Sequence, residues 1–136
     1  MSHPDGLPDL FLDRSLGRIK MPRLLRDAGL RLTTLAEHYG IPADEAVADT
    51  TWLELAGTAG WVVFMKDARI RSRRLEREAV QRFSVRCFCI TRQGLTAEAM
   101  AARYLDHLPA ITQACGAPGP CFYAVHENRI ERIDLR

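Results

Sequence analysis

The sequence lacks several features that would assign it to a membrane, secreted or zinc-binding class. No segment of its 136 residues approaches the roughly 20 consecutive apolar residues of a membrane-spanning helix. Its first residues lack the basic-then-apolar layout of a secretory signal, so we expect a cytoplasmic protein. Neither a C-x-x-C pair nor neighbouring histidines accompany the four cysteines, which we interpret as small buried residues rather than zinc ligands: Cys87, Cys89, Cys115 and Cys121.

Lysine is also scarce in this sequence. Of 19 basic residues only Lys20 and Lys66 are lysines, so nearly every cation is a guanidinium group, the better bidentate partner for phosphate oxygens. A biased genome composition would produce the same excess, and the net charge of +2 favours no partner by itself. The 47% hydrophobic and 26% charged composition is typical of a globular protein, and the length predicts a single domain.

The stretch with the clearest structural signal is the apolar run from Trp61 to Met65, which is rich in β-branched and aromatic residues. Such a run is typical of a strand buried on both faces of a parallel sheet. Shorter runs predict further strands, and apolar residues at helical spacing predict helices between them. The predicted strands are 9–13, 30–35, 61–66 and 84–91, with a C-terminal hairpin of 121–125 and 129–135; the predicted helices begin near Ser15, Asp49, Arg73 and Thr96, and 37–42 and 68–72 are loops.

Strands that alternate with helices imply a mostly parallel sheet with right-handed crossovers. We therefore predict an α/β fold, a three-layer α/β/α sandwich with four or five mostly parallel strands plus the C-terminal hairpin. Two prolines, a glycine and two acids among residues 1–9 predict a flexible N-terminal tail. Residues 10–136 are expected to form the single domain.

Two aspartates, Asp13 and Asp67, directly follow predicted strands. Because the carboxyl ends of parallel strands meet at one edge of a sheet, we expect the two to converge. Carboxylates brought together repel, and a hard divalent cation relieves the repulsion. Asp49, near the start of the helix that precedes the central strand, is a candidate third ligand, and Glu37, after the second strand, is a fourth. Such a set around Mg²⁺ or Mn²⁺ activates water for phosphodiester hydrolysis.

Arginines lie close to both aspartates in the sequence. Arg14 and Arg18 follow the first aspartate, and a cluster that also includes Arg73, Arg74 and Arg77 begins with Arg69 and Arg71 after the second. From these cations at the rim of the acidic site we expect Arg14, Arg18, Arg69 and Arg71 to hold phosphate groups. Ordinary structural roles fit the same residue types, because aspartates at these positions cap helices and arginines interleaved with glutamates form solvated, ion-paired faces. The residues alone leave both interpretations open.

Four segments, in order, resemble the PIN-like domains grouped with VapC-type toxins. They are Phe11-Leu12-Asp13-Arg14-Ser15-Leu16-Gly17, Leu24-Leu25-Arg26-Asp27-Ala28-Gly29-Leu30, Ala48-Asp49-Thr50-Thr51-Trp52-Leu53 and Gly60-Trp61-Val62-Val63-Phe64-Met65-Lys66-Asp67-Ala68-Arg69-Ile70-Arg71. The resemblance implies a PIN-like fold and a Mg²⁺- or Mn²⁺-dependent endoribonuclease. It further implies the toxin of a type II toxin-antitoxin pair, held inactive by a cognate antitoxin and often a homodimer. Asp13, Asp49 and Asp67 match the acidic positions of the family, and RNA becomes the expected ligand of the arginines.

The sequence departs from the family pattern at two places. Met65 stands where family members often have Thr or Ser, two residues before Asp67. The segment Thr91-Arg92-Gln93 has no carboxylate, although standard PIN domains carry an acid after the fourth strand. The alternative is therefore a non-catalytic PIN-like module that binds RNA or a protein partner. A receiver-like signalling domain would need adjacent acids early in the chain and a lysine after a late strand, and the sequence has neither.

Overall fold

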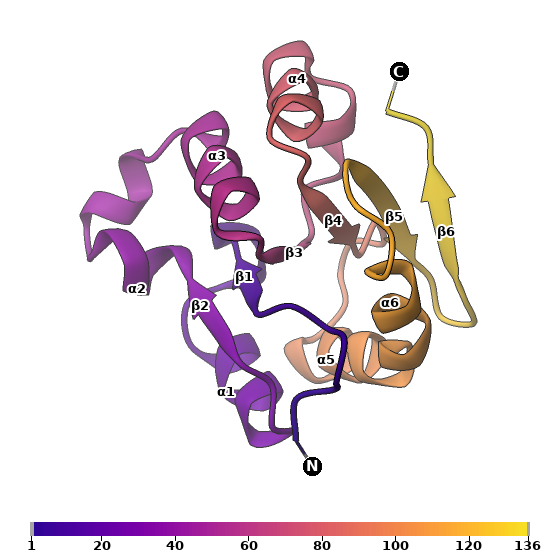
Figure 1. Cartoon of the computed structure of the whole chain (residues 1–136). Helices are drawn as coiled ribbons and strands as arrows, with labels where there is room; N and C mark the ends of the chain where they lie inside the picture. The colour runs from indigo at the N-terminus through magenta and orange to yellow at the C-terminus, as the bar shows by residue number, and fades with distance from the viewer. Residues whose placement is uncertain (1, 136) are drawn as a thin grey trace.

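The computed structural model describes residues 2–135, which contain one six-stranded sheet (Figure 1). Its strands lie in the order β2-β1-β3-β4-β5-β6, and all neighbours are parallel except β5 and β6, which form an antiparallel hairpin. The strands are β1 (Leu10–Leu12), β2 (Leu32–Thr34), β3 (Val62–Met65), β4 (Arg86–Cys89), β5 (Cys121–Val125) and β6 (Ile130–Ile133). The predicted α/β fold with a mostly parallel sheet and a C-terminal hairpin is confirmed.

Helices cover both faces of this sheet (Figure 1). One face carries α1 (Lys20–Asp27), α5 (Ala97–Asp106) and α6 (Leu108–Ala114), and the other carries α2 (Leu35–Tyr39), α3 (Asp49–Ala59) and α4 (Arg74–Arg82). Buried Leu10 and Leu12 join the first apolar cluster while Phe11 between them joins the second, because successive strand residues point to opposite faces. The result is the predicted three-layer sandwich.

The order of the strands reverses at β1, which lies between β2 and β3. The chain leaves β1 through α1 on one face and enters β3 from α3 on the other face. Leu12 pairs with Phe64, so β1 and β3 end side by side. Open α/β sheets form their ligand crevices outside the carboxyl ends of strands at such a reversal.

Tyr104 of α5 secures the ends of the two central strands. Its hydroxyl is fully buried, lies 2.9 Å from the Met65 carbonyl oxygen and 2.8 Å from that of Phe88, and accepts the Met65 amide at 3.1 Å. Its ring stacks on Phe64 with centroids 4.0 Å apart. A buried phenol with satisfied hydrogen bonds holds β3 and β4 in fixed register where the chain leaves the sheet.

The start of the first helix differs from the prediction. The sequence predicts a helix capped by Ser15, but α1 begins at Lys20 after a separate 3₁₀ turn, η1 (Arg14–Leu16). Pro22 accounts for the shift, because proline is tolerated in the first turn of a helix and not further along. The Asp13 side chain, rather than that of Ser15, caps η1 by accepting the Ser15 amide.

Two further predicted loops are helical in the structure. Residues 37–42 are predicted as a loop, but α2 forms there because Thr34 and Glu37 make a reciprocal capping box with each other's amides. Residues 68–72 contain the 3₁₀ turn η3 (Ala68–Arg71), which Asp67 caps. A third 3₁₀ turn, η2 (Ala43–Ala46), precedes α3. The four cysteines are buried free thiols, as predicted.

The N-terminal segment is anchored to the domain, whereas its composition alone predicts a flexible tail. His3 is 7% exposed, its Nδ1 accepts the Arg31 amide at 2.9 Å, and its Nε2 lies 2.8 Å from the Leu7 carbonyl oxygen. Because Nδ1 accepts a backbone N–H, the proton of a neutral ring is on Nε2, which donates to Leu7. Leu7 is buried in the same apolar cluster as α1 and α5.

Candidate active site

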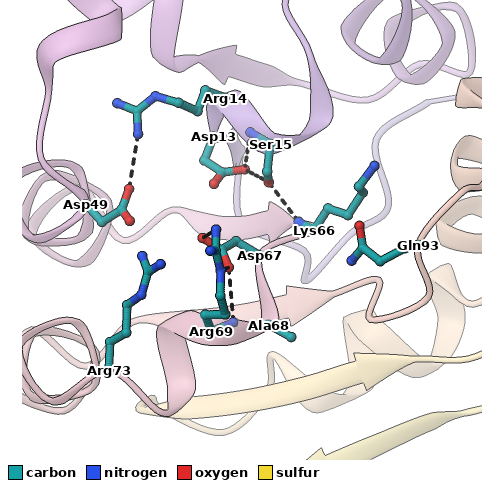
Figure 2. Close-up of a pocket in the computed structure, with 10 residues that line it drawn as sticks. All are labelled: Asp13, Arg14, Ser15, Asp49, Lys66, Asp67, Ala68, Arg69, Arg73 and Gln93. Atoms are coloured by element: carbon teal, nitrogen blue, oxygen red, sulfur yellow. Dashed lines mark hydrogen bonds and ion pairs between the residues drawn. The ribbon is translucent and has the colours of Figure 1, made fainter.

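Three aspartates line one cavity of about 600 Å³ at the carboxyl edge of the sheet (Figure 2). Asp13 follows β1 directly, and Asp67 follows β3 after one intervening lysine. Asp49 is the first residue of α3, and Ala48 occupies the N-cap position. The reversal of strand order brings these three residues together from distant parts of the chain. The other lining residues are Arg14, Ser15, Lys66, Ala68, Arg69, Arg73 and Gln93.

Asp13 is the most deeply buried of the three aspartates, with 4% of its surface exposed. Burial is the main cause that raises the pKa of Asp13 to about 7, and the nearby carboxylates Asp49 and Asp67 raise it further. Ser15 opposes this shift, because both its hydroxyl and its amide donate to Asp13 Oδ1. A carboxyl group in this environment ionises more readily when a positive charge is placed beside it.

Ser15 also links the two strand ends. Its Oγ accepts the backbone amide of Lys66 at 2.9 Å while donating to Asp13 (Figure 2). The serine therefore ties the residue after β1 to the residue after β3 through two consecutive hydrogen bonds. This contact fixes the distance between the two parts of the chain that carry Asp13 and Asp67.

Asp67 and Asp49 each bind an arginine. Arg69 donates to Asp67 Oδ1 from its amide at 3.1 Å and from Nε at 3.0 Å. Partial burial opposes ionisation of Asp67, but the hydrogen bonds and charge of Arg69 outweigh it, so the pKa of Asp67 is lowered. Asp49 Oδ1 accepts Arg14 at 3.3 Å and the Trp52 indole N–H at 2.9 Å.

The structure does not bring every predicted site residue to the cavity. Glu37 is held elsewhere, because Arg26 donates to both of its carboxylate oxygens at 2.8 Å, and this pairing lowers the pKa of Glu37. Arg18 pairs with the buried Asp44 at 2.8 and 2.9 Å, and Arg71 is not among the lining residues. Of the four predicted phosphate-binding arginines, only Arg14 and Arg69 line the cavity.

Three lining residues were missed as site candidates, Ser15, Lys66 and Gln93, and a fourth, Arg73, was noted only as one of the arginines that follow Asp67. The rule that located the aspartates also applies to Lys66 and Gln93, since both follow parallel strands that end at this edge. Ser15 lies two residues after Asp13, the spacing at which an aspartate side chain accepts a backbone amide. Arg73 could not be separated from its arginine neighbours by sequence alone.

The three aspartates are the oxygen donors that the cavity offers to a divalent cation. Within residues 2–135, no three His, Cys, Asp or Glu side chains are arranged to chelate an ion as they stand. Arg14 and Arg69 hold two of the three aspartates. The chemistry of the set nonetheless fits a hard cation, because all three side chains offer only oxygen ligands and two of them raise the pKa of the third. The residues present therefore suit Mg²⁺ or Mn²⁺ better than a softer metal.

An α/β sandwich with aspartates gathered at the reversal of its parallel sheet defines a class of domain with an acidic site at the strand ends. The chain belongs to the PIN-like domain family, since the family model described as "PIN like domain" matches residues 8–92. The matched residues include β1 to β4 and all three aspartates, and the match confirms the resemblance seen in the sequence.

A curated relative extends this similarity over nearly the whole chain. The "Putative ribonuclease VapC45" of Mycobacterium tuberculosis (strain ATCC 25618 / H37Rv) is 46% identical over 127 residues, which cover 93% of this chain and 92% of the relative. No solved structure matches the chain. None of the helices formed by residues 2–135 is long and apolar enough to cross a membrane.

Proposed function

We propose that this protein is a Mg²⁺- or Mn²⁺-dependent endoribonuclease and the toxin of a type II toxin-antitoxin pair, acting in the cytoplasm. The observation that carries the proposal is the convergence of Asp13, Asp49 and Asp67 in one cavity. The 46% identity to a protein named as a ribonuclease supports RNA as the substrate. Phosphodiester hydrolysis is the reaction for which an oxygen-only carboxylate set at such an edge is suited.

In this proposal Asp13, Asp49 and Asp67 hold the cation. When bound, Mg²⁺ or Mn²⁺ supplies an activated water and neutralises charge on the phosphate. Ser15 keeps Asp13 Oδ1 oriented through two hydrogen bonds, and a single hydrogen bond from the Trp52 indole orients Asp49. Each carboxylate is therefore restricted to few rotamers before substrate arrives, which reduces the entropy lost on binding.

Two of the three arginines that line the cavity, Arg14 and Arg69, have different roles. Arg14 donates to the Asp44 carbonyl at 3.0 Å and to the Val47 carbonyl as well as to Asp49. It therefore holds the segment that leads into α3 and positions Asp49. The Arg69 side chain is 71% exposed, and we assign it to the scissile phosphate. We assign no contact with that phosphate to Arg18 or Arg71, which lie outside the cavity lining.

The proposal includes partners beyond the RNA substrate. The resemblance to VapC-type toxins implies a cognate antitoxin protein and a homodimer. Co-purification of this chain with the product of a small neighbouring reading frame, followed by mass measurement of the complex, tests both partners. Inhibition of RNA cleavage by the co-purified protein is the expected result.

The decisive test of the activity compares Asp13→Asn with Asp27→Asn in Mn²⁺-dependent cleavage of RNA. Asp27 is exposed at the end of α1 and lies outside the cavity, so its variant is the matched control. Asp13→Asn is expected to lower the rate by more than about 100-fold, because even the outer partners of metal ligands are worth roughly 10- to 100-fold. Equal rates for the two variants would refute the assignment.

A second candidate function is a non-catalytic module that binds RNA or a protein through the same cavity. Gln93 favours it, because an amide rather than a carboxylate lines the cavity after β4. A ligand that binds only the native state raises the apparent stability, so titration with Mn²⁺ separates the two candidates. A rise in melting temperature at millimolar Mn²⁺ supports the nuclease, and no rise supports the module.

A further inference from the structure

The cations that line the cavity fall into two pairs. Arg14 and Arg69 are already hydrogen-bonded to Asp49 and Asp67. The Lys66 ammonium and the guanidinium of Arg73, by contrast, take part in none of the hydrogen bonds or ion pairs found within residues 2–135. Moving a paired arginine to a phosphate leaves a carboxylate without its partner, whereas an unpaired cation binds phosphate with no such loss.

These two unpaired cations lie on opposite sides of the aspartates. Figure 2 shows Arg73 beside Asp49 and Asp67, and Lys66 extending the other way toward Gln93. The alternation of strand β3 explains the separation. Phe64 faces the α1 and α5 side of the sheet and Met65 faces the α3 and α4 side, so the next residue, Lys66, continues toward the α1 and α5 side. Arg73 is the N-cap residue of α4, which covers the other face.

The charge of the cavity also favours a bound phosphate chain. Four cationic side chains and three carboxylates line it, which leaves a net charge of +1 even when all three aspartates are ionised. In Figure 2 the Lys66 side chain extends toward the uncharged amide of Gln93, and no ion pair of the Lys66 ammonium is found within residues 2–135. Arg73 acts on Asp67 only through its charge and keeps its donors available.

We infer that Lys66 and Arg73 bind the two backbone phosphates that flank the scissile one, so that single-stranded RNA crosses the cavity from Arg73 to Lys66. The inference rests on the proposed function for the position of the scissile phosphate, between the two cations and over the aspartates. It assigns RNA binding to Lys66, which the sequence patterns did not indicate, and to Arg73, which they did not separate from the neighbouring arginines, and it leaves Arg14 to position Asp49.

The test measures RNA binding separately from cleavage. A short, fluorescein-labelled single-stranded oligoribonucleotide is titrated with protein in EDTA, and fluorescence anisotropy is followed at several salt concentrations. Lys66→Gln is compared with Lys20→Gln, whose lysine pairs with Glu98 on α5, and Arg73→Gln with Arg74→Gln, whose arginine pairs with Glu78. Both control residues lie outside the cavity.

Lys66→Gln and Arg73→Gln are each expected to raise Kd by roughly three- to sixfold. Each should also make the negative slope of the log association constant against log salt concentration shallower by about 0.7, which corresponds to the loss of one phosphate contact on a single strand. The controls keep the wild-type slope, and Lys66→Arg restores it. Circular dichroism confirms that all variants are folded.

Wild-type slopes in both cavity variants, or no binding by the wild-type protein at low salt, overturn the inference. Because the readout needs no metal, an absence of Mn²⁺-dependent cleavage would overturn the proposed nuclease activity while a reduced slope would still support the phosphate contacts.

Discussion

Strands β1 and β3 are each followed by an aspartate that caps a 3₁₀ turn, but the pKa values of the two aspartates are shifted in opposite directions. Asp13 caps the 3₁₀ turn η1 and Asp67 caps η3, and each side chain accepts the amide two residues later. The residue at that position is Ser15 in one case and Arg69 in the other. Burial raises the pKa of the first aspartate to about 7, while the arginine lowers the pKa of the second.

The comparison shows that the turn determines the orientation of each carboxylate, whereas burial and neighbouring charges determine its pKa. Each aspartate is oriented by a 3₁₀ turn of the same kind, but of the two only Asp67 has a cation within hydrogen-bond distance. Near neutral pH the site therefore combines a carboxylate that is fully ionised with one that is about half ionised. In the proposed nuclease a cation bound by Asp13 would complete the ionisation of that carboxyl, so binding of the cation and loss of the proton would be coupled.

The largest expected effect comes from removing the buried carboxyl with Asp13→Asn. The folded pKa of Asp13 lies above its ordinary value of 3.8, so the native state keeps a proton that the unfolded state loses. Wild-type stability therefore falls between pH 4 and pH 7, by up to about 4 kcal/mol. The variant is expected to gain stability over wild type by that amount at pH 8 and little at pH 4, as measured by urea denaturation in EDTA. A pH-independent difference would contradict the raised pKa.

The next effect comes from the serine that the comparison singles out. Ser15→Ala removes the hydroxyl that donates to Asp13 and accepts the Lys66 amide, and is expected to cost about 1–3 kcal/mol of stability. It also raises the pKa of Asp13, because the hydroxyl lowers it, so the acidic limb of the cleavage profile moves to higher pH. Ser72→Ala, which removes an exposed hydroxyl from the turn after Asp67, is the control and should change stability by less than about 0.5 kcal/mol.

Affinity for Mn²⁺ should depend on pH through the same carboxyl. Because Asp13 must lose its proton to bind the ion, affinity is expected to fall about tenfold for each pH unit below 7 and to level off above it. The shift of the melting temperature by Mn²⁺, measured from pH 5.5 to 8.5, reports this dependence. In Asp13→Asn the shift should be small at every pH, and a large, pH-independent shift in wild type would count against Asp13 as a ligand.

The position of the aspartates was predictable from the sequence because it depends only on strand order. A buried apolar run followed by an acid is visible in the residues, and parallel pairing then places Asp13 and Asp67 at one edge. The partners of the other side chains were not predictable in this way. Arg18 meets Asp44 from 26 residues away, and Glu37 meets Arg26 through the packing of α1 near β2. The ion-pair partners of long side chains depend on tertiary contacts, which local sequence patterns do not reveal.

The smallest expected effect, and the one that closes the comparison, comes from Asp67→Asn. Asparagine caps a turn as well as aspartate does, so the variant keeps the cap and loses the ion pair with Arg69 and the weaker attraction to Arg73. The folded pKa of Asp67 is lowered, so its charge contributes stability above its ordinary value of 3.8, and this contribution is lost as the pH falls through the folded pKa. Since Arg69 is exposed, the expected loss at pH 7 is less than about 1 kcal/mol and decreases at high salt. Asp67→Asn is thus expected to destabilise the protein at pH 8, whereas Asp13→Asn stabilises it. If urea denaturation at pH 8 shows that Asp67→Asn is stabilising, the opposite pKa shifts of the two aspartates are contradicted.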